Sequence, residues 1–223
     1  MHPITRPDWL PERGMCRFDE IDPGRTALLV IDMQVVFVED GQPATGEHSS
    51  AIVPNINRLS TALRDAGGVV AFTRHTITDE GPSAIAGWQR AIPRLAELEP
   101  LFRPGRREHD VDPSMDCQPG DIVLDKFRYS AFAANSSTLH DALQARGIDT
   151  VIVTGVVTNC CCETTARDAH MLGYKTFFVE DGTAAMSDEE HSAALVSLGS
   201  IFADVRTTDD ILALIHGQKA KAA

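Results

Sequence analysis

Apolar and polar positions along the chain follow two periods, one typical of buried strands and the other typical of helices that cover a sheet. Continuous apolar runs at 26–33 and 150–156 predict strands that are buried on both faces. Shorter apolar runs predict four further strands, at 69–74, 121–126, 175–181 and 201–206. Between the strands, apolar residues recur at helical spacing, as they do from Ile52 to Leu63. This alternation predicts a three-layer α/β/α fold with a mostly parallel, Rossmann-like sheet.

Start and stop signals for helices divide the rest of the chain. Glycines at 67–68 and at 147 end two predicted helices, and a capping pattern at 187–190 opens another. Thr208, followed by two acids, opens the last predicted helix. Residues 76–119 carry no regular pattern, and a stretch of this length inside a compact domain predicts a lid or a pocket wall.

Length and composition are those of a single globular domain. The chain has 223 residues, of which 43% are hydrophobic and 23% are charged. We expect the domain at 21–216, with an N-terminal arm at 1–20 and a C-terminal tail at 217–223. The formal net charge of −12 disfavours nucleic acid and anionic membranes as partners. No apolar run approaches the roughly 20 residues that are needed to span a bilayer.

The cysteines indicate the cellular setting. Three of the five are consecutive, a pattern that does not build a disulfide framework. The first residues show no apolar segment of the kind that directs secretion. We therefore expect a cytoplasmic, reducing environment.

The three consecutive thiols lie at the junction of a predicted strand and a predicted helix. An apolar strand at 150–154 is followed by Gly155, and a helical pattern then continues as far as Leu172. Residues 160–162 therefore lie in the first turn of a helix, where unpaired backbone N–H groups and the helix dipole favour a thiolate near neutral pH. The stretch predicts a nucleophile. Successive helical side chains lie about 100° apart, so only one of the three thiols can point squarely into a pocket.

Two further ionisable residues are predicted at the carboxyl ends of other strands. Asp32 follows the first strand and Lys126 the third. Ligands of open parallel sheets bind beyond these ends. A carboxylate there could accept the proton of a thiol, and a lysine beside both would hold them in their charged forms. Taken singly, Asp32 could instead cap a turn and Lys126 could be a surface residue, so the prediction rests on their convergence.

Three motifs resemble those of the isochorismatase-like cysteine hydrolase family, which includes nicotinamidases, N-carbamoylsarcosine amidases and ureidoacrylate amidohydrolases. They are LVIDMQ at 29–34, VLDK at 123–126 and TGVVTNCCCE at 154–163, and the resemblance runs from about Thr26 to Leu214. A fourth segment, KFRYSAF at 126–132, is similar to the ureidoacrylate and N-carbamoyl amidohydrolase branch. The resemblance implies the isochorismatase-like hydrolase fold.

The resemblance also implies a role for individual residues. The family's nucleophile lies two residues after the Asn of its motif, which corresponds to Cys161 in this sequence. Asp32 then matches the family's proton acceptor and Lys126 its triad lysine. A cis peptide bond is implied between Val156 and Val157, and the backbone N–H groups of Val157 and Cys161 are implied as the oxyanion hole.

Two departures from family patterns narrow the expected chemistry. Isochorismatases proper cleave a vinyl ether without a nucleophilic cysteine, so Cys161 argues against that activity. Nicotinamidases bind a metal through an Asp-x-His pair and a second histidine, which residues 73–79 do not reproduce. We expect no metal and no cofactor, and the resemblance implies a homodimer or a homotetramer.

Together these observations predict an enzyme that hydrolyses the C–N bond of a small linear amide or of a ureido or carbamoyl compound through a thioester. A nicotinamidase-like amidase is the alternative within the family. The alternatives from other classes are a thiol redox or metal-binding protein that uses residues 160–162 and a binding module without catalysis. Adjacent helical cysteines diverge, however, and the chain has no CxxC motif.

Candidates for substrate binding lie in the loops near the predicted site. Aromatic residues at pocket walls often shape a substrate, although each could equally be ordinary packing. An arginine at the far end of the pocket would favour a substrate that carries a carboxylate. His75 and Asn159 could contact substrate, but a structural histidine and a helix cap are the simpler interpretations. The predicted substrate-binding residues are Phe37, Arg74, Trp88, Arg128 and Tyr129.

Overall fold

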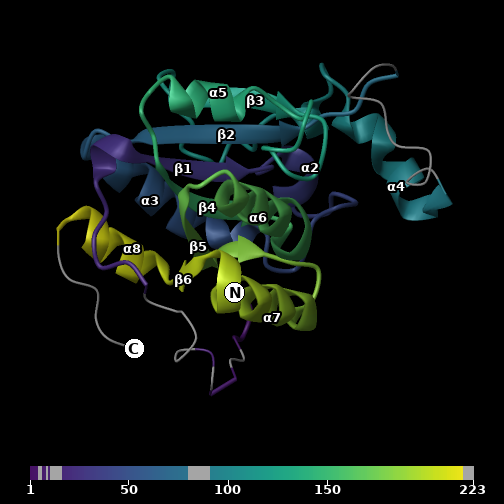
Figure 1. Cartoon of the computed structure of the whole chain (residues 1–223). Helices are drawn as coiled ribbons and strands as arrows, with labels where there is room; N and C mark the ends of the chain where they lie inside the picture. The colour runs from purple at the N-terminus through teal and green to yellow at the C-terminus, as the bar shows by residue number, and fades with distance from the viewer. Residues whose placement is uncertain (5–6, 9, 11–16, 80–90, 218–223) are drawn as a thin grey trace.

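The computed structural model describes residues 1–4, 7–8, 10, 17–79 and 91–217, which form a single parallel sheet between two layers of helices (Figure 1). The strand order is β3-β2-β1-β4-β5-β6, and every pair of neighbours is parallel. The strands are β1 (Thr26–Ile31), β2 (Val69–His75), β3 (Ile122–Lys126), β4 (Thr150–Val156), β5 (Lys175–Ala184) and β6 (Asp204–Arg206).

The predicted strands and the predicted three-layer architecture are confirmed, with two changes at the ends of strands. β5 continues three residues beyond its predicted end, to Ala184. β6 begins at Asp204 rather than at 201, because residues 198–202 extend the preceding helix as a π-helical turn. Ile201, which the apolar pattern placed in the strand, lies 60% exposed on that turn.

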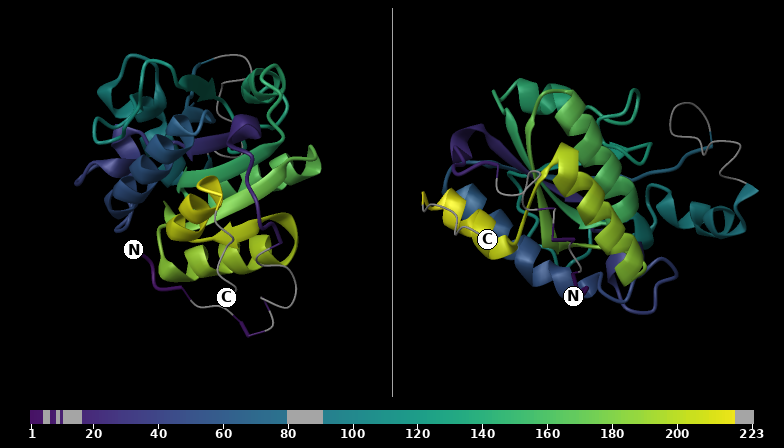
Figure 2. Two further views of the ribbon diagram at one scale, coloured as in Figure 1. Left: turned by 90° about the vertical axis from the view of Figure 1, so that its left-hand side faces the viewer. Right: turned by 60° about the horizontal axis from the view of Figure 1, so that its bottom comes forward.

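Helices cover both faces of the sheet (Figure 2). On one face, α3 (Val53–Asp65) and α8 (Thr208–Ile215) pack against each other and against β1 and β5. The other face carries α5 (Leu139–Gln144), α6 (Glu163–Met171) and α7 (Asp188–Ser197). Because β1 and β4 are buried on both faces, neither needs a polar side, which explains their continuous apolar runs.

Local capping explains where the last two helices begin. Ser187 accepts a hydrogen bond from the backbone N–H of Glu190, as its capping pattern predicted. The last helix is capped one residue earlier than expected. Thr207 and Asp210 form a reciprocal capping box, so Thr208 is the first helical residue rather than the cap.

The segment at 76–119, predicted to lack regular structure, contains short helices where it is described. It includes α4 (Pro93–Leu98) and single 3-10 turns at Glu99–Phe102 and Arg107–His109. With α2 (Val35–Val38), which follows β1, it lies beyond the carboxyl ends of the strands, and α4 stands out from the body (Figure 1). The segment is therefore placed where the sheet opens to ligands.

The N-terminal residues that the structure describes lie against the domain. His2 contacts Asp188, and the backbone N–H of Phe18 donates to Asp204. The predicted boundaries at 20 and 217 stay predictions. None of the helices in the described ranges has the length and apolar character that crossing a membrane would require.

Candidate active site

The register of the sheet brings Asp32 and Lys126 together although they follow different strands. Asp32 comes directly after β1, and Lys126 is the last residue of β3, which is separated from β1 by β2. The lysine side chain reaches back across the end of β2, and its Nζ lies 2.8 Å from Oδ2 of Asp32. Both side chains are 0% exposed. The predicted convergence of these two residues is therefore present in the structure.

The charge on Lys126 is maintained by its neighbours. Burial alone would lower the pKa of the lysine, but the negative charge of Asp32, the neighbouring Cys161 and the hydrogen bonds to both raise that pKa above its ordinary value. Nζ also donates to the carbonyl oxygen of Arg128 at 3.0 Å. The lysine is therefore an ammonium that touches both the carboxylate and the thiol.

Asp32 is held by its backbone as well as by its side chain. Its φ is +52°, a left-handed conformation that is uncommon for residues other than glycine. The backbone N–H donates to the carbonyl oxygen of Thr73 at 3.2 Å, and the Thr73 hydroxyl donates to Oδ1 of Asp32 at 2.8 Å. Each carboxylate oxygen of Asp32 thus has its own partner, Thr73 on one side and Lys126 on the other.

The turn that carries the thiols is fixed by close backbone packing. Gly155 has a φ of +108°, and a Cβ atom there would lie 2.1 Å from the carbonyl oxygen of Ile31. The chain then passes through a cis peptide bond between Val156 and Val157. The helix begins as a π-helical turn, Thr158–Cys162, before α6 continues it. Only glycine fits the first position, because β1 runs directly beside it.

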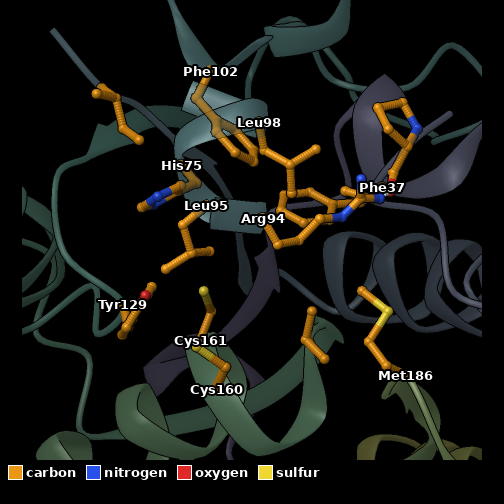
Figure 3. Close-up of a pocket in the computed structure, with 14 residues that line it drawn as sticks. Phe37, His75, Arg94, Leu95, Leu98, Phe102, Tyr129, Cys160, Cys161 and Met186 are labelled. Carbon is orange, nitrogen blue, oxygen red and sulfur yellow. Dashed lines mark hydrogen bonds between the residues drawn. The ribbon is translucent and has the colours of Figure 1, made fainter. Parts of the chain in front are cut away.

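The three thiols have different surroundings. Cys162 is 0% exposed, and burial raises the pKa of its thiol well above the ordinary value. Cys160 is half-buried, packs against the core and also lines a cavity. Cys161 is 5% exposed and also faces that cavity, with its sulfur pointing inward (Figure 3). The structure thus separates Cys161 and Cys160 from the fully enclosed Cys162.

The protonation of Cys161 differs from the expectation of a ready thiolate. The hydrogen bond with Cys160, burial and the charge of Asp32 raise the pKa of the Cys161 thiol, and the opposing effect of Lys126 does not reverse this. The helix-dipole expectation did not include the hydrogen bond with Cys160 and the burial of the thiol, both of which favour its protonated form. Cys161 therefore requires a base, and Asp32 is the carboxylate beside it.

A cavity of about 290 Å³ opens above the Cys161 sulfur (Figure 3). Two of the predicted substrate-binding residues, Phe37 and Tyr129, contribute to it, as does His75. Burial and the nearby charge of Lys126 lower the pKa of His75 well below its ordinary value, so its ring is neutral. The lining residues are Phe37, Pro43, Ala44, His75, Ile77, Arg94, Leu95, Leu98, Phe102, Tyr129, Val157, Cys160, Cys161 and Met186.

The other predicted substrate-binding residues lie elsewhere. Arg74 forms an ion pair with Asp125 at 2.8 Å and does not line this cavity. The guanidinium of Arg128 donates to the carbonyl oxygen of Phe127, and it too is absent from the lining. Neither arginine therefore belongs to the wall of this cavity, where a substrate carboxylate was expected to meet one of them. Trp88 lies outside the described residues.

α4 lies in the segment that was predicted to form a lid or a pocket wall and does line the cavity, but none of its residues was among the predicted substrate-binding residues. Leu95 and Leu98 point into the cavity from this helix, and Arg94 lies at its edge. A proline at 93 followed by leucines three residues apart is a helix signal, so the apolar face could have been found. Met186, which follows β5, carries no comparable signal.

Two polar residues of the motifs, Gln34 and Asn159, have surroundings that the motifs did not indicate. The Gln34 side chain accepts from the backbone N–H of His75 at 2.7 Å and donates to the carbonyl oxygen of His109 at 2.8 Å. It thereby ties the end of β1 to β2 and to the loop segment. Asn159, interpreted as a helix cap, is not one: Val157 occupies the cap position, and the buried Oδ1 of Asn159 has no hydrogen-bond partner among the described residues.

One cluster outside the cavity has the composition of a metal site. Ligand atoms of His2, His48 and Asp188 lie within 4.8 Å of one another. However, Nδ1 of His2 contacts Asp188 at 2.6 Å, and its Nε2 accepts from the backbone N–H of Ala185 at 3.0 Å. Because Nε2 acts as the acceptor, Nδ1 carries the proton and has no lone pair to offer a metal. The cluster instead fastens the N-terminus to the start of α7.

Comparisons with known proteins agree with the motifs and with the fold. The family model described as Isochorismatase domain matches residues 26–210. Ureidoacrylate amidohydrolase RutB of Pseudomonas syringae pv. syringae (strain B728a) is 32% identical over 226 residues, covering 93% of this chain and 91% of the relative. Nicotinamidase 3 of Arabidopsis thaliana is 35% identical over 185 residues, covering 79% and 82%.

Solved structures give the same result. The crystal structure of a cysteine hydrolase from Pseudomonas syringae pv. phaseolicola 1448A superposes with a TM-score of 0.81 at 30% identity, covering 91% of this chain and 99% of that one. The predicted family, fold class and hydrolase character are thereby confirmed. With the domain matched over nearly its whole length, the chain belongs to the isochorismatase family.

Proposed function

We propose that this protein is a cysteine-dependent amidohydrolase that cleaves the C–N bond of a small linear amide or of a ureido or carbamoyl compound. The observation that carries the proposal is the ion pair between Asp32 and Lys126, 2.8 Å long and 0% exposed, beside the inward-facing thiol of Cys161. A buried ion pair contributes little net stability, because desolvating both charges offsets their attraction. Its position at the floor of a cavity therefore supports a chemical role.

In the first half of the proposed reaction, Asp32 accepts the proton of Cys161 and the thiolate attacks the substrate's carbonyl carbon. The positive charge of Lys126 stabilises the carboxylate of Asp32 before the proton is transferred and the thiolate of Cys161 after it. The negative charge that develops on the substrate oxygen is stabilised by the backbone N–H groups of Val157 and Cys161. The C–N bond then breaks, Asp32 returns the proton to the leaving nitrogen, and an acyl thioester remains on Cys161.

In the second half, water replaces the departed amine or ammonia. Asp32 accepts a proton from the water as its oxygen attacks the thioester carbon. The C–S bond breaks, the acid product leaves, and Cys161 regains its proton. The thiol has a raised pKa, and this suits a cycle in which it is protonated at rest and loses its proton only towards Asp32.

The proposal includes no metal and no cofactor. Residues 73–79 do not reproduce the Asp-x-His pair and second histidine through which nicotinamidases bind a metal. A cytoplasmic setting and a homodimeric or homotetrameric assembly stay predictions that rest on composition and on the family resemblance.

Ammonia release from a panel of small amides, N-carbamoyl amino acids and ureido acids tests the proposal. Replacing Cys161 with serine should reduce the rate at least about 10³-fold, because the hydroxyl is a far weaker nucleophile at the same position. Cys117→Ser is the matched control, since this free cysteine lies outside the cavity. Acid-quenched protein should carry the acyl mass on the peptide that contains Cys161. Retained turnover by Cys161→Ser, or inhibition by a chelator, would contradict the mechanism.

A further inference from the structure

The residues that line the cavity above Cys161 indicate the chemistry of the part of the substrate that lies beyond the scissile carbonyl. Across from the Cys161 sulfur lies Leu95 of α4, with Leu98 and Phe102 further along the same wall (Figure 3). Phe37 faces Phe102, and their ring centroids are 5.4 Å apart. Because rings at this separation are in contact, Phe37 and Phe102 form one aromatic surface, and the space into which the substrate must extend is bounded by aliphatic and aromatic carbon.

The positive charges near this space are engaged by protein groups. Arg94 is the one cation among the described residues that line the cavity, and it donates to the carbonyl oxygen of Pro43 and lies 3.5 Å from Glu97. Lys126 is paired with Asp32 beneath the thiol, and Arg74 is paired with Asp125 outside the lining. Each of these three cations therefore already has a partner within the protein.

The size and polarity of the cavity both limit the substrate. A volume of about 290 Å³ lies at the small end of the roughly 300–1,000 Å³ typical of pockets for drug-sized ligands. A carboxylate placed against the leucines and phenylalanines that line the cavity would lose its hydration without gaining a partner charge, which is strongly unfavourable. An uncharged chain of the same length would instead bury apolar surface.

We propose that the substrate is an amide whose body is a short, uncharged, apolar chain, and that α4, through Leu95, selects it against chains that end in a carboxylate. The inference rests on the proposed function, because it describes the substrate of the same site. It differs from the expectation that an arginine such as Arg74 or Arg128 binds the carboxylate of an acidic substrate.

A matched pair of six-carbon amides tests the selection. Hexanamide ends in a methyl group, and adipamate, the monoamide of adipic acid, ends in a carboxylate. We expect kcat/KM, measured as ammonia release, to favour hexanamide by about 10²-fold or more, the discrimination typical of a site in which one ligand leaves a charge unpaired. Binding of each amide to Cys161→Ala, measured by calorimetry, should show the same order without any turnover.

Two lysine substitutions on the same segment locate the selecting surface. Leu95→Lys places an ammonium across from the thiol and should reduce the preference for hexanamide at least about ten-fold by giving the carboxylate a partner. Ile92→Lys is the matched control, because Ile92 is 41% exposed just before α4 and does not line the cavity. The preference of Ile92→Lys for hexanamide over adipamate, measured as the ratio of kcat/KM, should equal that of the unchanged protein.

The outcomes separate the inference from the proposed function. Ammonia release with equal or greater preference for adipamate overturns the inference and leaves the amidohydrolase proposal intact. Selective binding of hexanamide without ammonia release supports the inference and contradicts the proposed function. A change in preference that is the same for Leu95→Lys and Ile92→Lys overturns the assignment to Leu95. Failure of both amides to bind or react overturns the inference, and the panel of N-carbamoyl amino acids and ureido acids then decides the proposed function separately.

Discussion

The cluster of Asp32, Lys126 and Cys161 and the wall formed by α4 face the same cavity but are built in opposite ways. The cluster lies at the ends of central strands, its members are at most 5% exposed, and charges and hydrogen bonds restrain each of them. The α4 wall is a helix of six residues that stands out from the body, with only Leu98 of the six fully buried. Leu95, Leu98 and Arg94 of this helix line the cavity, so the wall is mainly apolar.

The difference shows how the protein can separate reaction from selection. A change within the cluster disturbs groups that also hold the strand ends together, so chemistry and stability are coupled there. A change on α4 alters what the cavity admits while the sheet is left intact. We therefore expect substitutions in the cluster to reduce activity and stability together and by large amounts. Substitutions away from the cluster should have smaller effects on activity and stability, and these effects should be separable.

The largest effect is expected from Lys126→Met, which removes the cation and keeps a side chain of similar length. Asp32 would stay buried without its partner, which typically costs about 3–5 kcal/mol of unfolding free energy. The rate of ammonia release should fall about 10²–10³-fold, because the charge that stabilises the thiolate is lost. Urea unfolding and steady-state kinetics measure the two losses.

A double substitution, Lys126→Met with Asp32→Asn, checks that the lost stability comes from the unpaired charge. Removing both charges should restore much of the unfolding free energy while the enzyme stays inactive. If Lys126→Met instead loses activity at unchanged stability, chemistry and stability are not coupled at the cluster, and the contrast with α4 fails.

The next effect concerns the backbone that supports Cys161. Gly155→Ala would place a methyl group 2.1 Å from the carbonyl oxygen of Ile31, so β1 and β4 would have to separate. We expect a loss of about 3–5 kcal/mol in unfolding free energy, from overpacking together with the positive φ. Gly147→Ala is the control, because its φ is +69° and nothing lies within 4 Å of the added carbon. That variant should lose only about 1 kcal/mol, and an equal loss in both would exclude close packing as the cause.

The same contrast explains what the sequence could predict. Apolar runs identified β1 and β4, and Asp32, Lys126 and Cys160–Cys162 followed from their places at strand ends, because parallel strands bring these ends together whatever the side chains do. The selection of Cys161 needed the family resemblance. Arg74 and Arg128 failed as substrate contacts because the direction of a side chain depends on partners such as Asp125, which a motif does not specify.

Contacts between distant segments were not predictable for a related reason. His191 of α7 meets the hydroxyl of Thr158 through Nδ1 at 2.9 Å, and its ring stacks on His2, whose ring centroid is 4.4 Å away. These three residues have no shared spacing or periodicity in the sequence. Their contact depends on how α7 and the N-terminal residues pack beside the nucleophile turn. These three residues form a third region, distinct from the cluster and from the α4 wall.

A pH-dependent effect is expected at this third region. Burial, followed by the charge of His2, lowers the pKa of His191 to about 4 in the folded protein, against about 6.5 in an unfolded chain. As pH falls from 6.5 to 4, the unfolded state gains a proton that the folded state does not, so the unfolding free energy should fall by at most about 3 kcal/mol. Asp188 and His48, the other titratable groups beside His191, also contribute to its surroundings.

His191→Asn isolates this contribution because an amide can still bond to Thr158. The variant should show a flatter dependence of unfolding free energy on pH between 6.5 and 4, measured by urea titrations at each pH. His216→Asn, at an exposed histidine that follows α8, is the control and should keep the slope of the unchanged protein. If the unfolding free energy of His191→Asn depends on pH as that of the unchanged protein does, the acid sensitivity arises from another group and His191 does not couple the nucleophile turn to pH.

The smallest expected effect tests whether the cluster depends on single hydrogen bonds. Thr73→Val keeps the side-chain shape but removes the hydroxyl that donates to Oδ1 of Asp32 at 2.8 Å. A hydrogen bond to a charged group contributes about 1.5–3 kcal/mol, so kcat/KM should fall about ten-fold and unfolding free energy by about 1–2 kcal/mol. Thr154→Val on β4 is the matched control, since its buried hydroxyl donates only to the backbone carbonyl of Leu29. It should lose similar stability at unchanged kcat/KM, and a parallel loss of activity in both variants would mean that the sheet as a whole, rather than the restraint on Asp32, governs the reaction.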